Sequence, residues 1–167
     1  MSLKFGDSTL YCIKEFPASF KAVGMKHIAL VGMGGNIGDV RGRFKRVLRY
    51  LTLGKLFRPI ETAPLFYNPP FGFTDQPFFT NTLVLGETNL NAHELLRYLL
   101  WVERRFGRKR SFPNAPRSLD LDIIFFDNLQ LRSTRLTIPH PNFSERESVV
   151  VPMHFLSAEN RSSICRG

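Results

Sequence analysis

The stretch 116–126 constrains the fold of this 167-residue chain more than any other. It is an apolar run broken by two carboxylates, Asp120 and Asp122, and we expect it to form a buried β-strand. Side chains on a strand alternate between its two faces, so both carboxylates share one face while Leu119, Leu121 and Ile123 face a core. Two ionised carboxylates in such a strand are costly unless they are paired or hold a cation between them.

Two interpretations of this acidic pair are open. Oxygen ligands of this kind suit Mg²⁺ or Mn²⁺, so the pair can be a metal site. Alternatively, it is a strand end whose acids pair with surface lysines or arginines. The loop immediately before the strand is basic, with Arg108, Lys109, Arg110 and Arg117. Cations beside a two-carboxylate metal site are what a nucleoside triphosphate requires, and this adjacency favours the metal interpretation.

The charge balance agrees with an anionic partner. The formal net charge is +9 and the sequence pI is near 10.1, which favours nucleic acid, a phosphorylated small molecule or an anionic membrane surface. No apolar run approaches the roughly 20 residues of a membrane span. Two cysteines, Cys12 and Cys165, make neither a disulfide framework nor a metal cluster, so we expect a reducing compartment, the cytoplasm.

The order of expected elements is strand, helix, strand, strand, helix, strand. A buried strand over 27–31 leads into a glycine-rich turn over 32–39, for which we expect positive φ, and Asp39 caps the helix that follows. Asn91 and Glu94 form a capping box for the second helix, whose buried side we expect to include Leu100 and Trp101, with Glu103 on its exposed or cleft side. The other expected strands cover 56–67, 78–85 and the acidic stretch.

This order indicates an α+β fold, the ferredoxin-like βαββαβ sandwich, with additional elements at both ends. We expect an N-terminal extension over 1–26 that packs on the domain or on a second subunit, one globular domain over 27–160 and a frayed tail over 161–167. A homodimer is therefore an open alternative.

Two further places can carry chemistry. Phe79 and Asn81 share a strand face after a Pro/Gly-rich loop, so a ring and an amide can read a flat heterocycle; a core Phe beside a structural Asn is equally consistent with the residues. His140, held between two prolines with Arg146 downstream, can donate to a phosphate, although a lone His is more often structural.

Four motifs in order resemble the 6-hydroxymethyl-7,8-dihydropterin pyrophosphokinase family of folate biosynthesis. The strongest carriers are 116–123 and 138–141, supported by 34–39 and 75–81. The resemblance covers about Ile28 to Phe155 and implies transfer of pyrophosphate from MgATP to a pterin hydroxymethyl oxygen, with AMP leaving.

The resemblance also implies roles for individual residues. Asp120 and Asp122 would hold two Mg²⁺ ions, with Arg108 and Arg117 acting beside them in catalysis. The ATP-binding residues would be Glu103, Arg108, Arg110, Arg117, His140 and Arg146. The pterin-binding residues would be Asn68, Pro69, Phe71, Phe79 and Asn81. The implied partners are therefore ATP and the pterin, with no nucleic acid and no membrane.

The chain departs from the family pattern at two places of interest. Ser148 stands where some members have the aromatic ring opposite Phe79, for which Phe143 or another ring can substitute, and Asn114 stands where some have Trp. Two rival functions use the same topology: a different two-metal nucleotidyl-transfer enzyme, and a non-enzymatic RNA-binding module. The first leaves the Phe79/Asn81 pair unexplained, and the second would place acids against phosphate.

Overall fold

The computed structural model describes residues 2–156 and 165, and shows a seven-stranded sheet with helices on both faces. The described elements, in chain order, are β1 (Ser2–Phe5), β2 (Ser8–Tyr11), β3 (His27–Gly35), α1 (Val40–Gly54), β4 (Phe57–Thr62), β5 (Leu65–Asn68), β6 (Phe79–Thr88), α2 (Ala92–Arg105), β7 (Asp120–Phe126), β8 (Leu131–Arg132), β9 (Thr137–Ile138), the 3₁₀ helix η1 (Phe143–Glu145) and α3 (Glu147–His154). The sheet order is β1-β2-β5-β6-β3-β7, with β4 also paired to β6. The expected ferredoxin-like βαββαβ order is confirmed in β3, α1, β4–β5, β6, α2 and β7.

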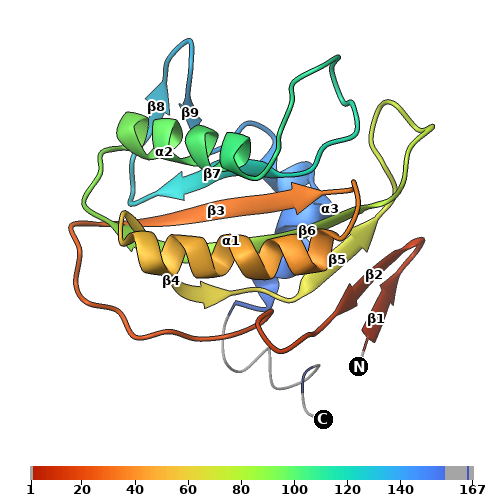
Figure 1. Ribbon diagram of the computed structural model, residues 1–167, viewed down its shortest axis with the longest axis horizontal. Helices are drawn as coiled ribbons and strands as arrows, with labels where there is room; N and C mark the ends of the chain where they lie inside the picture. The colour runs from red at the N-terminus through yellow and green to blue at the C-terminus, as the bar shows by residue number, and fades with distance from the viewer. Residues whose placement is uncertain (1, 157–164, 166–167) are drawn as a thin grey trace.

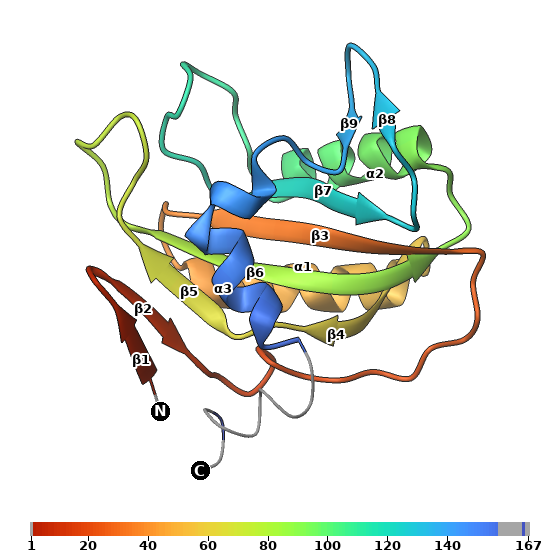
Figure 2. The same cartoon turned by 180° about the vertical axis from the view of Figure 1, so that it is seen from behind.

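The helices form two layers. In Figures 1 and 2, α1 and α2 cover one face of the sheet and α3 crosses the other. Alternation along the strands supplies the core between the sheet and α1 and α2: Leu119, Leu121 and Ile123 are buried there as expected, together with Phe44 and Leu99. A smaller cluster around Val149 lies under α3.

Both main helices begin where the sequence predicts. The Asp39 carboxylate accepts the Gly42 N–H at 3.0 Å, and the Asn91 and Glu94 side chains form the reciprocal capping box at 2.9 Å each. The predicted burial of Trp101 is wrong: the side chain is 49% exposed and packs near Tyr50, because it lies off the stripe of α2 that continues from Leu95 through Leu99.

The strand expected over 56–67 is two strands. β4 ends at Thr62 and β5 begins at Leu65, and both pair antiparallel with β6. The break falls at Ala63 and Pro64, whose carbonyls accept hydrogen bonds from the Thr82 hydroxyl at 2.9 and 3.1 Å. A proline lacks the N–H that a continuous ladder needs, so the strand bends here.

The glycine-rich stretch is not the turn that we expected. Gly32, Gly34 and Gly35 belong to β3, and within this stretch only Gly38 has positive φ, at 69°. The strand glycines allow close approach instead: a Cβ on Gly35 would lie 2.5 Å from the Ser118 carbonyl oxygen, and one on Gly34 would collide with the Asn81 side chain.

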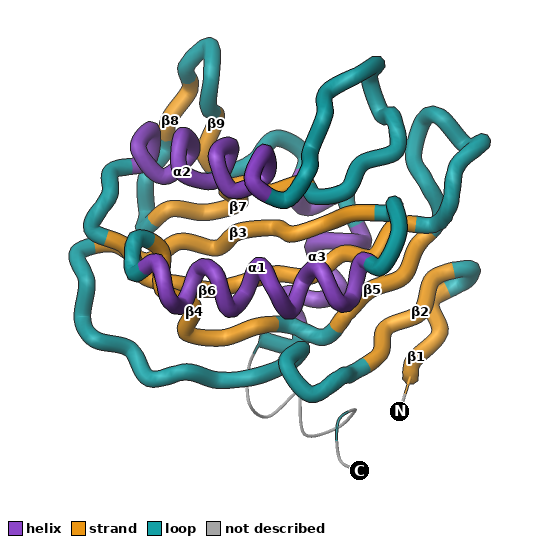
Figure 3. Tube along the Cα trace, viewed as in Figure 1, coloured by secondary structure: helices purple, strands orange, loops and turns teal. Residues whose placement is uncertain are grey.

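The N-terminal extension joins the sheet. β1 and β2 form a hairpin, and β2 pairs with β5 at the edge far from β7 (Figure 3). After it, residues 23–25 donate three backbone hydrogen bonds of 2.6 to 3.2 Å to the buried Glu87 carboxylate. This pairing supports the expectation that the extension packs on the domain.

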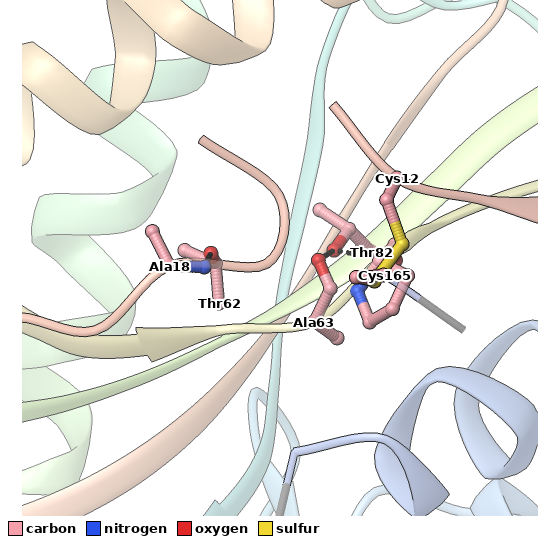
Figure 4. Close-up of a disulfide and its surroundings, with 7 residues drawn as sticks. Cys12, Ala18, Thr62, Ala63, Thr82 and Cys165 are labelled. Carbon is pink, nitrogen blue, oxygen red and sulfur yellow. Dashed lines mark hydrogen bonds between the residues drawn. A yellow bond between two sulfur atoms is a disulfide. The ribbon is translucent and has the colours of Figure 1, made fainter. Parts of the chain in front are cut away.

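The prediction that the two cysteines make no disulfide is wrong. Cys12, just after β2, is bonded to Cys165 with a Cα–Cα distance of 6.0 Å (Figure 4). The two lie 153 residues apart in sequence, and spacing gives no hint that the fold brings them together. Apart from Cys165, the frayed tail expected over 161–167 lies outside the described residues.

Candidate active site

The two acids of β7 point to the face that α1 and α2 leave open. Asp120 and Asp122 are partly exposed while their neighbours Leu121 and Ile123 are buried, so the predicted alternation is confirmed. In the antiparallel pairing of β7 with β3, Asp120 lies opposite Gly34 and Asp122 opposite Gly32. Glycines have no side chain, so the Asn81 side chain of β6 lies over Gly34, where a Cβ would collide with it.

Two arginines flank Asp120. The Arg108 Nη1 lies 3.1 Å from its Oδ1, and the Arg117 Nη1 lies 3.3 Å from its Oδ2. Each guanidinium is also held by backbone: Arg108 donates to the Leu119 carbonyl at 2.8 Å, and Arg117 Nε to the Ala115 carbonyl at 3.1 Å. The basic loop thus folds back onto the start of β7, as its sequence position predicts.

Asp122 has a different environment. Burial raises the pKa of this carboxyl to about 7, with the negative charges of Asp120 and Glu103 adding to the shift and Arg146 and Arg117 opposing it. Within residues 2–156 and 165, no ion pair or hydrogen bond engages its side chain. A carboxylate whose ionisation is disfavoured by a neighbouring carboxylate gains most from a cation.

Mg²⁺ fits this donor set. Among the described residues, no group of three or more His, Cys, Asp or Glu side chains is arranged to hold a metal. Two carboxylates remain, and Mg²⁺ is commonly held by one or two carboxylates, with substrate phosphates and water completing the octahedron. Asp120 and Asp122 would therefore hold the metal together with the nucleotide rather than alone.

Glu103 is not on an exposed or cleft side of α2, contrary to our expectation. It is 2% exposed, and its Oε2 accepts the Leu121 N–H at 2.7 Å. Burial raises the pKa of Glu103, and the charge of Asp120 adds to the shift. Arg110, whose side chain is largely exposed, lies 3.6 Å from Oε1. Glu103 thus anchors α2 to the backbone of β7 between the two acids.

The candidate pterin residues lie on the same face. Asn68 pairs with Phe79 across β5 and β6, and Asn81 donates to the Asn68 Oδ1 at 2.7 Å. The guanidinium carbon of Arg117 lies 5.3 Å from the centroid of the Phe79 ring. Pro69 is half-buried and accepts from the Asn68 amide at 3.0 Å, whereas Phe71 is 87% exposed in the following loop and joins no cluster of the described residues.

His140 and Arg146 approach from the segment before α3. The His140 N–H donates to the Ile124 carbonyl at 2.9 Å, which fixes this segment beside β7. Burial lowers the pKa of His140, and the Arg146 charge lowers it further. Its Nδ1 and the Ser118 Oγ are both buried without a hydrogen-bond partner among the described residues. Buried polar atoms without partners are uncommon, and at a site they are available to a ligand.

The ring that could replace the missing aromatic at position 148 is otherwise engaged. Phe143 packs edge-on against Phe125 at 4.7 Å between centroids. Asn114 has positive φ, at 59°, and its carbonyl accepts from the Gln76 side chain at 2.8 Å. Phe73 and Phe112 pack edge-on at 5.2 Å between centroids, and the loops that contain them project side by side from one end of the sheet (Figures 1 and 2).

Asn36 is the residue that our sequence reasoning missed. It is buried, its Oδ1 accepts the Arg117 N–H, and its Nδ2 donates to the Gln76 Oε1 and the Pro77 carbonyl, all at 2.9 Å. Its own N–H donates to the Arg117 carbonyl at 2.9 Å. One side chain thus joins the end of β3 to the loop that contains Gln76 and Pro77 and to the loop that contains Arg117. The signal was its place within the 34–39 motif, which we interpreted as a turn and as support for the family resemblance without giving Asn36 a role.

Comparison with known proteins decides between the functions that this site can serve. Residues 30–158 match the family model described as 7,8-dihydro-6-hydroxymethylpterin-pyrophosphokinase (HPPK). The chain belongs to the HPPK family. Its activity is accordingly ATP-dependent transfer of pyrophosphate to hydroxymethyl-dihydropterin in folate biosynthesis, and not the nucleotidyl transfer that we considered.

Individual HPPK relatives agree. A Campylobacter jejuni protein named 2-amino-4-hydroxy-6-hydroxymethyldihydropteridine pyrophosphokinase is 42% identical over 77% of this chain and 82% of its own length. A Helicobacter pylori protein of the same name is 39% identical over 83% and 86%. A mitochondrial folate synthesis bifunctional protein of Arabidopsis thaliana is 38% identical over 77% of this chain but only 23% of its own length.

Proposed function

We propose that this HPPK chain carries out its reaction on the face of β7, β3 and β6 that bears Asp120, Gly34 and Asn81. The observation that carries the proposal is one row across three strands: Gly34 pairs with Asp120 on one side and with Asn81 on the other. Strands lie about 4.8 Å apart, so the metal-binding acid and the pterin-reading amide are separated by roughly two strand spacings, with only the glycine between them in this row. A substrate lying over Gly34 reaches both.

The nucleotide side of this row is cationic. Arg108 and Arg117 flank Asp120, and we propose that they turn to the triphosphate when it binds, with His140, Arg146 and Arg110 contributing further positive or donor groups. We propose Glu103 as a positioning residue of the ATP site, because it holds β7 through the Leu121 N–H.

Asp120 and Asp122 would hold the metal, for which we propose two Mg²⁺ ions, and the bound metal would supply neutralisation of the triphosphate and a lower pKa of the substrate hydroxyl. The hydroxymethyl oxygen attacks the β-phosphorus, the bond from that phosphorus to the α–β bridging oxygen breaks, and AMP leaves. We propose that Arg108 and Arg117, which flank Asp120, stabilise the charge that moves onto the departing phosphate in the transition state.

The pterin side of the row is polar and aromatic. We propose that the Asn81 and Asn68 amides read the polar edge of the pterin while the Phe79 ring stacks on its face, with Pro69 and Phe71 of the adjoining loop covering it. Asn81→Ala should weaken pterin binding much more than ATP binding. Calorimetric titration with each ligand checks this, and equal losses would reject the pocket.

We propose that the partners are small molecules only and that 27–160 folds as one domain. None of the helices within residues 2–156 is long and apolar enough to cross a membrane. We propose the cytoplasm as the location. The number of cysteines no longer supports a reducing compartment, because Cys12 and Cys165 form a disulfide. Alkylation of free thiols at lysis, followed by reduction and titration of the thiols released, tests whether the disulfide exists in the cell, and sedimentation tests the homodimer.

The direct test of function is AMP release from ATP. We expect release that requires both Mg²⁺ and hydroxymethyl-dihydropterin, and that falls by several orders of magnitude in Asp120→Ala, with Asp7→Ala as a matched control on the exposed hairpin turn. Near-normal turnover in Asp120→Ala, or AMP release without the pterin, would contradict the proposal.

A further inference from the structure

A hollow of about 500 Å³ lies between the N-terminal hairpin, the start of α1, the end of β5 and the start of β6. Its walls include Tyr11, Arg41, Tyr67, Phe78 and Thr80. The volume is within the range of about 300–1,000 Å³ that small-molecule pockets occupy. None of the residues assigned above to ATP, metal or pterin lines it.

The hollow lies on the opposite face of the sheet from the acids. Residues paired across antiparallel strands share a face, and Tyr67 pairs with Thr9 of β2 on one side and Thr80 of β6 on the other. The neighbouring pair, Asn68 and Phe79, belongs to the opposite face. The same two strands therefore present the candidate pterin residues on one side and the hollow on the other.

The chemistry of the walls is aromatic and cationic. The Tyr67 and Phe78 rings lie 5.1 Å apart between centroids, and the Tyr11 ring adds a third aromatic surface. Arg41 lines the same hollow as Tyr11. Burial raises the pKa of the Tyr11 hydroxyl, and the charge of Arg41 opposes that shift.

The first turn of α1 adds to the positive charge of Arg41, because a helix N-terminus has a partial positive charge. The Asp39 carboxylate also lines the hollow and opposes an anion. Its Oδ1 accepts the Gly42 N–H and caps the helix, so Arg41, and not the helix N-terminus, is the group left to pair with an anion.

We propose that this hollow binds a small planar aromatic ligand that carries a phosphate or carboxylate group. The ring would pack among Tyr11, Tyr67 and Phe78, and the anionic group would pair with Arg41. The Tyr11 wall comes from the extension, which precedes the residues 30–158 that match the HPPK family. The other walls named above lie within 30–158, and the site is additional to the pyrophosphokinase site because it lies on the opposite face of the sheet from Asn68 and Phe79.

Phenyl phosphate is a suitable probe because it combines one ring with one anion. We expect saturable shifts of the Tyr11, Tyr67 and Thr80 amide resonances in titrations of the ¹⁵N-labelled full chain. Benzamidine, with the same ring and a positive charge, should give none. Saturable shifts confined to residues 108–122 would overturn the site, since they would place phenyl phosphate in the triphosphate site only.

Variants of α1 test the assignment of the cation. Arg41→Ala should weaken phenyl phosphate binding at the hollow by about fivefold, the upper end of what one exposed ion pair contributes. Arg49→Ala, an exposed arginine about two turns further along the same helix, should leave it within twofold. Equal affinities of wild type and Arg41→Ala, or equal binding of phenyl phosphate and benzamidine, would overturn the proposal.

Discussion

At the scale of single residues, the metal-binding role that we propose for Asp122 comes at the expense of stability. Its pKa is raised to about 7 in the folded protein, so ionisation is disfavoured there relative to the unfolded chain. The resulting destabilisation is absent below the unfolded pKa near 4 and grows as the pH rises toward 7. A group kept at such a cost is expected to have a role that packing does not explain.

We therefore predict that Asp122→Asn lowers turnover by about three orders of magnitude or more while the metal-free protein becomes equally or more stable. The gain in melting temperature over wild type should be larger at pH 8 than at pH 5. Thermal melts at both pH values check this. Mg²⁺ with ATP should stabilise wild type more than the variant, and a variant that melts lower at pH 8 would contradict the assignment.

We also expect a substitution at Asn36 to lower activity, because this side chain contacts both the Pro77 carbonyl and the Arg117 N–H. Asn36→Asp keeps the acceptor for the Arg117 N–H but replaces the donor to the Pro77 carbonyl with a charged acceptor. We expect kcat/KM for the pterin to fall about tenfold or more, corresponding to about 1.4 kcal/mol or more. Steady-state kinetics checks this, with Asn89→Asp as the control, since Asn89 accepts the Lys26 N–H far from the site loops.

At the scale of elements, the sequence predicted the features that depend on neighbouring residues alone. The two-residue period of β7 placed both acids on one face, and the caps at Asp39 and Asn91 fixed the helix starts. Glu103 was misplaced although the signal was present: it lies four residues after Leu99 and eight after Leu95, on the buried stripe of α2. We gave its charge more weight than its position, and its backbone partner on β7 is not visible in sequence.

Residues 23–25 are held to the domain by the hydrogen bonds that their backbone N–H groups donate to the Glu87 carboxylate. Burial alone would raise the Glu87 pKa, but the backbone N–H groups of Val23, Met25 and Gly24 and the charge of Arg58 lower it overall. A depressed folded pKa gives stability that is present above the unfolded pKa near 4.3 and is lost as the pH falls through the folded value.

Glu87→Gln should consequently cost about 2 kcal/mol of unfolding free energy at pH 7 and flatten the acid side of the stability curve. Urea unfolding from pH 3 to pH 7 measures this. The exposed Glu147→Gln serves as the control, since it should leave the curve unchanged. A constant difference between Glu87→Gln and wild type at every pH would contradict the role given to the carboxylate.

At the scale of the whole molecule, the disulfide joins parts that no local pattern connects. Cys12 follows the first hairpin and its partner Cys165 lies 153 residues later, so the bond closes a loop that contains most of the 167-residue chain. A constraint of this kind on the unfolded chain stabilises the fold by typically 2–4 kcal/mol. Only the tertiary structure brings the two thiols together, which explains why the sequence interpretation failed.

We predict that Cys12→Ser loses about 2–4 kcal/mol of unfolding free energy. Dithiothreitol should destabilise wild type by a similar amount and leave Cys12→Ser unchanged. Chemical denaturation of both proteins with and without reductant measures this. If reduction destabilised the variant as much as the wild type, the effect would not come from this bond.

The contact between Arg117 and the Phe79 ring has a consequence for the sequence of events at the site. The guanidinium lies 5.3 Å from the centroid of that ring, so Arg117 covers the surface on which we propose that the pterin stacks. Incoming triphosphate gives the same guanidinium a stronger attraction elsewhere. We therefore expect bound ATP to draw the Arg117 guanidinium away from the Phe79 ring, so that ATP binds first and the pterin second.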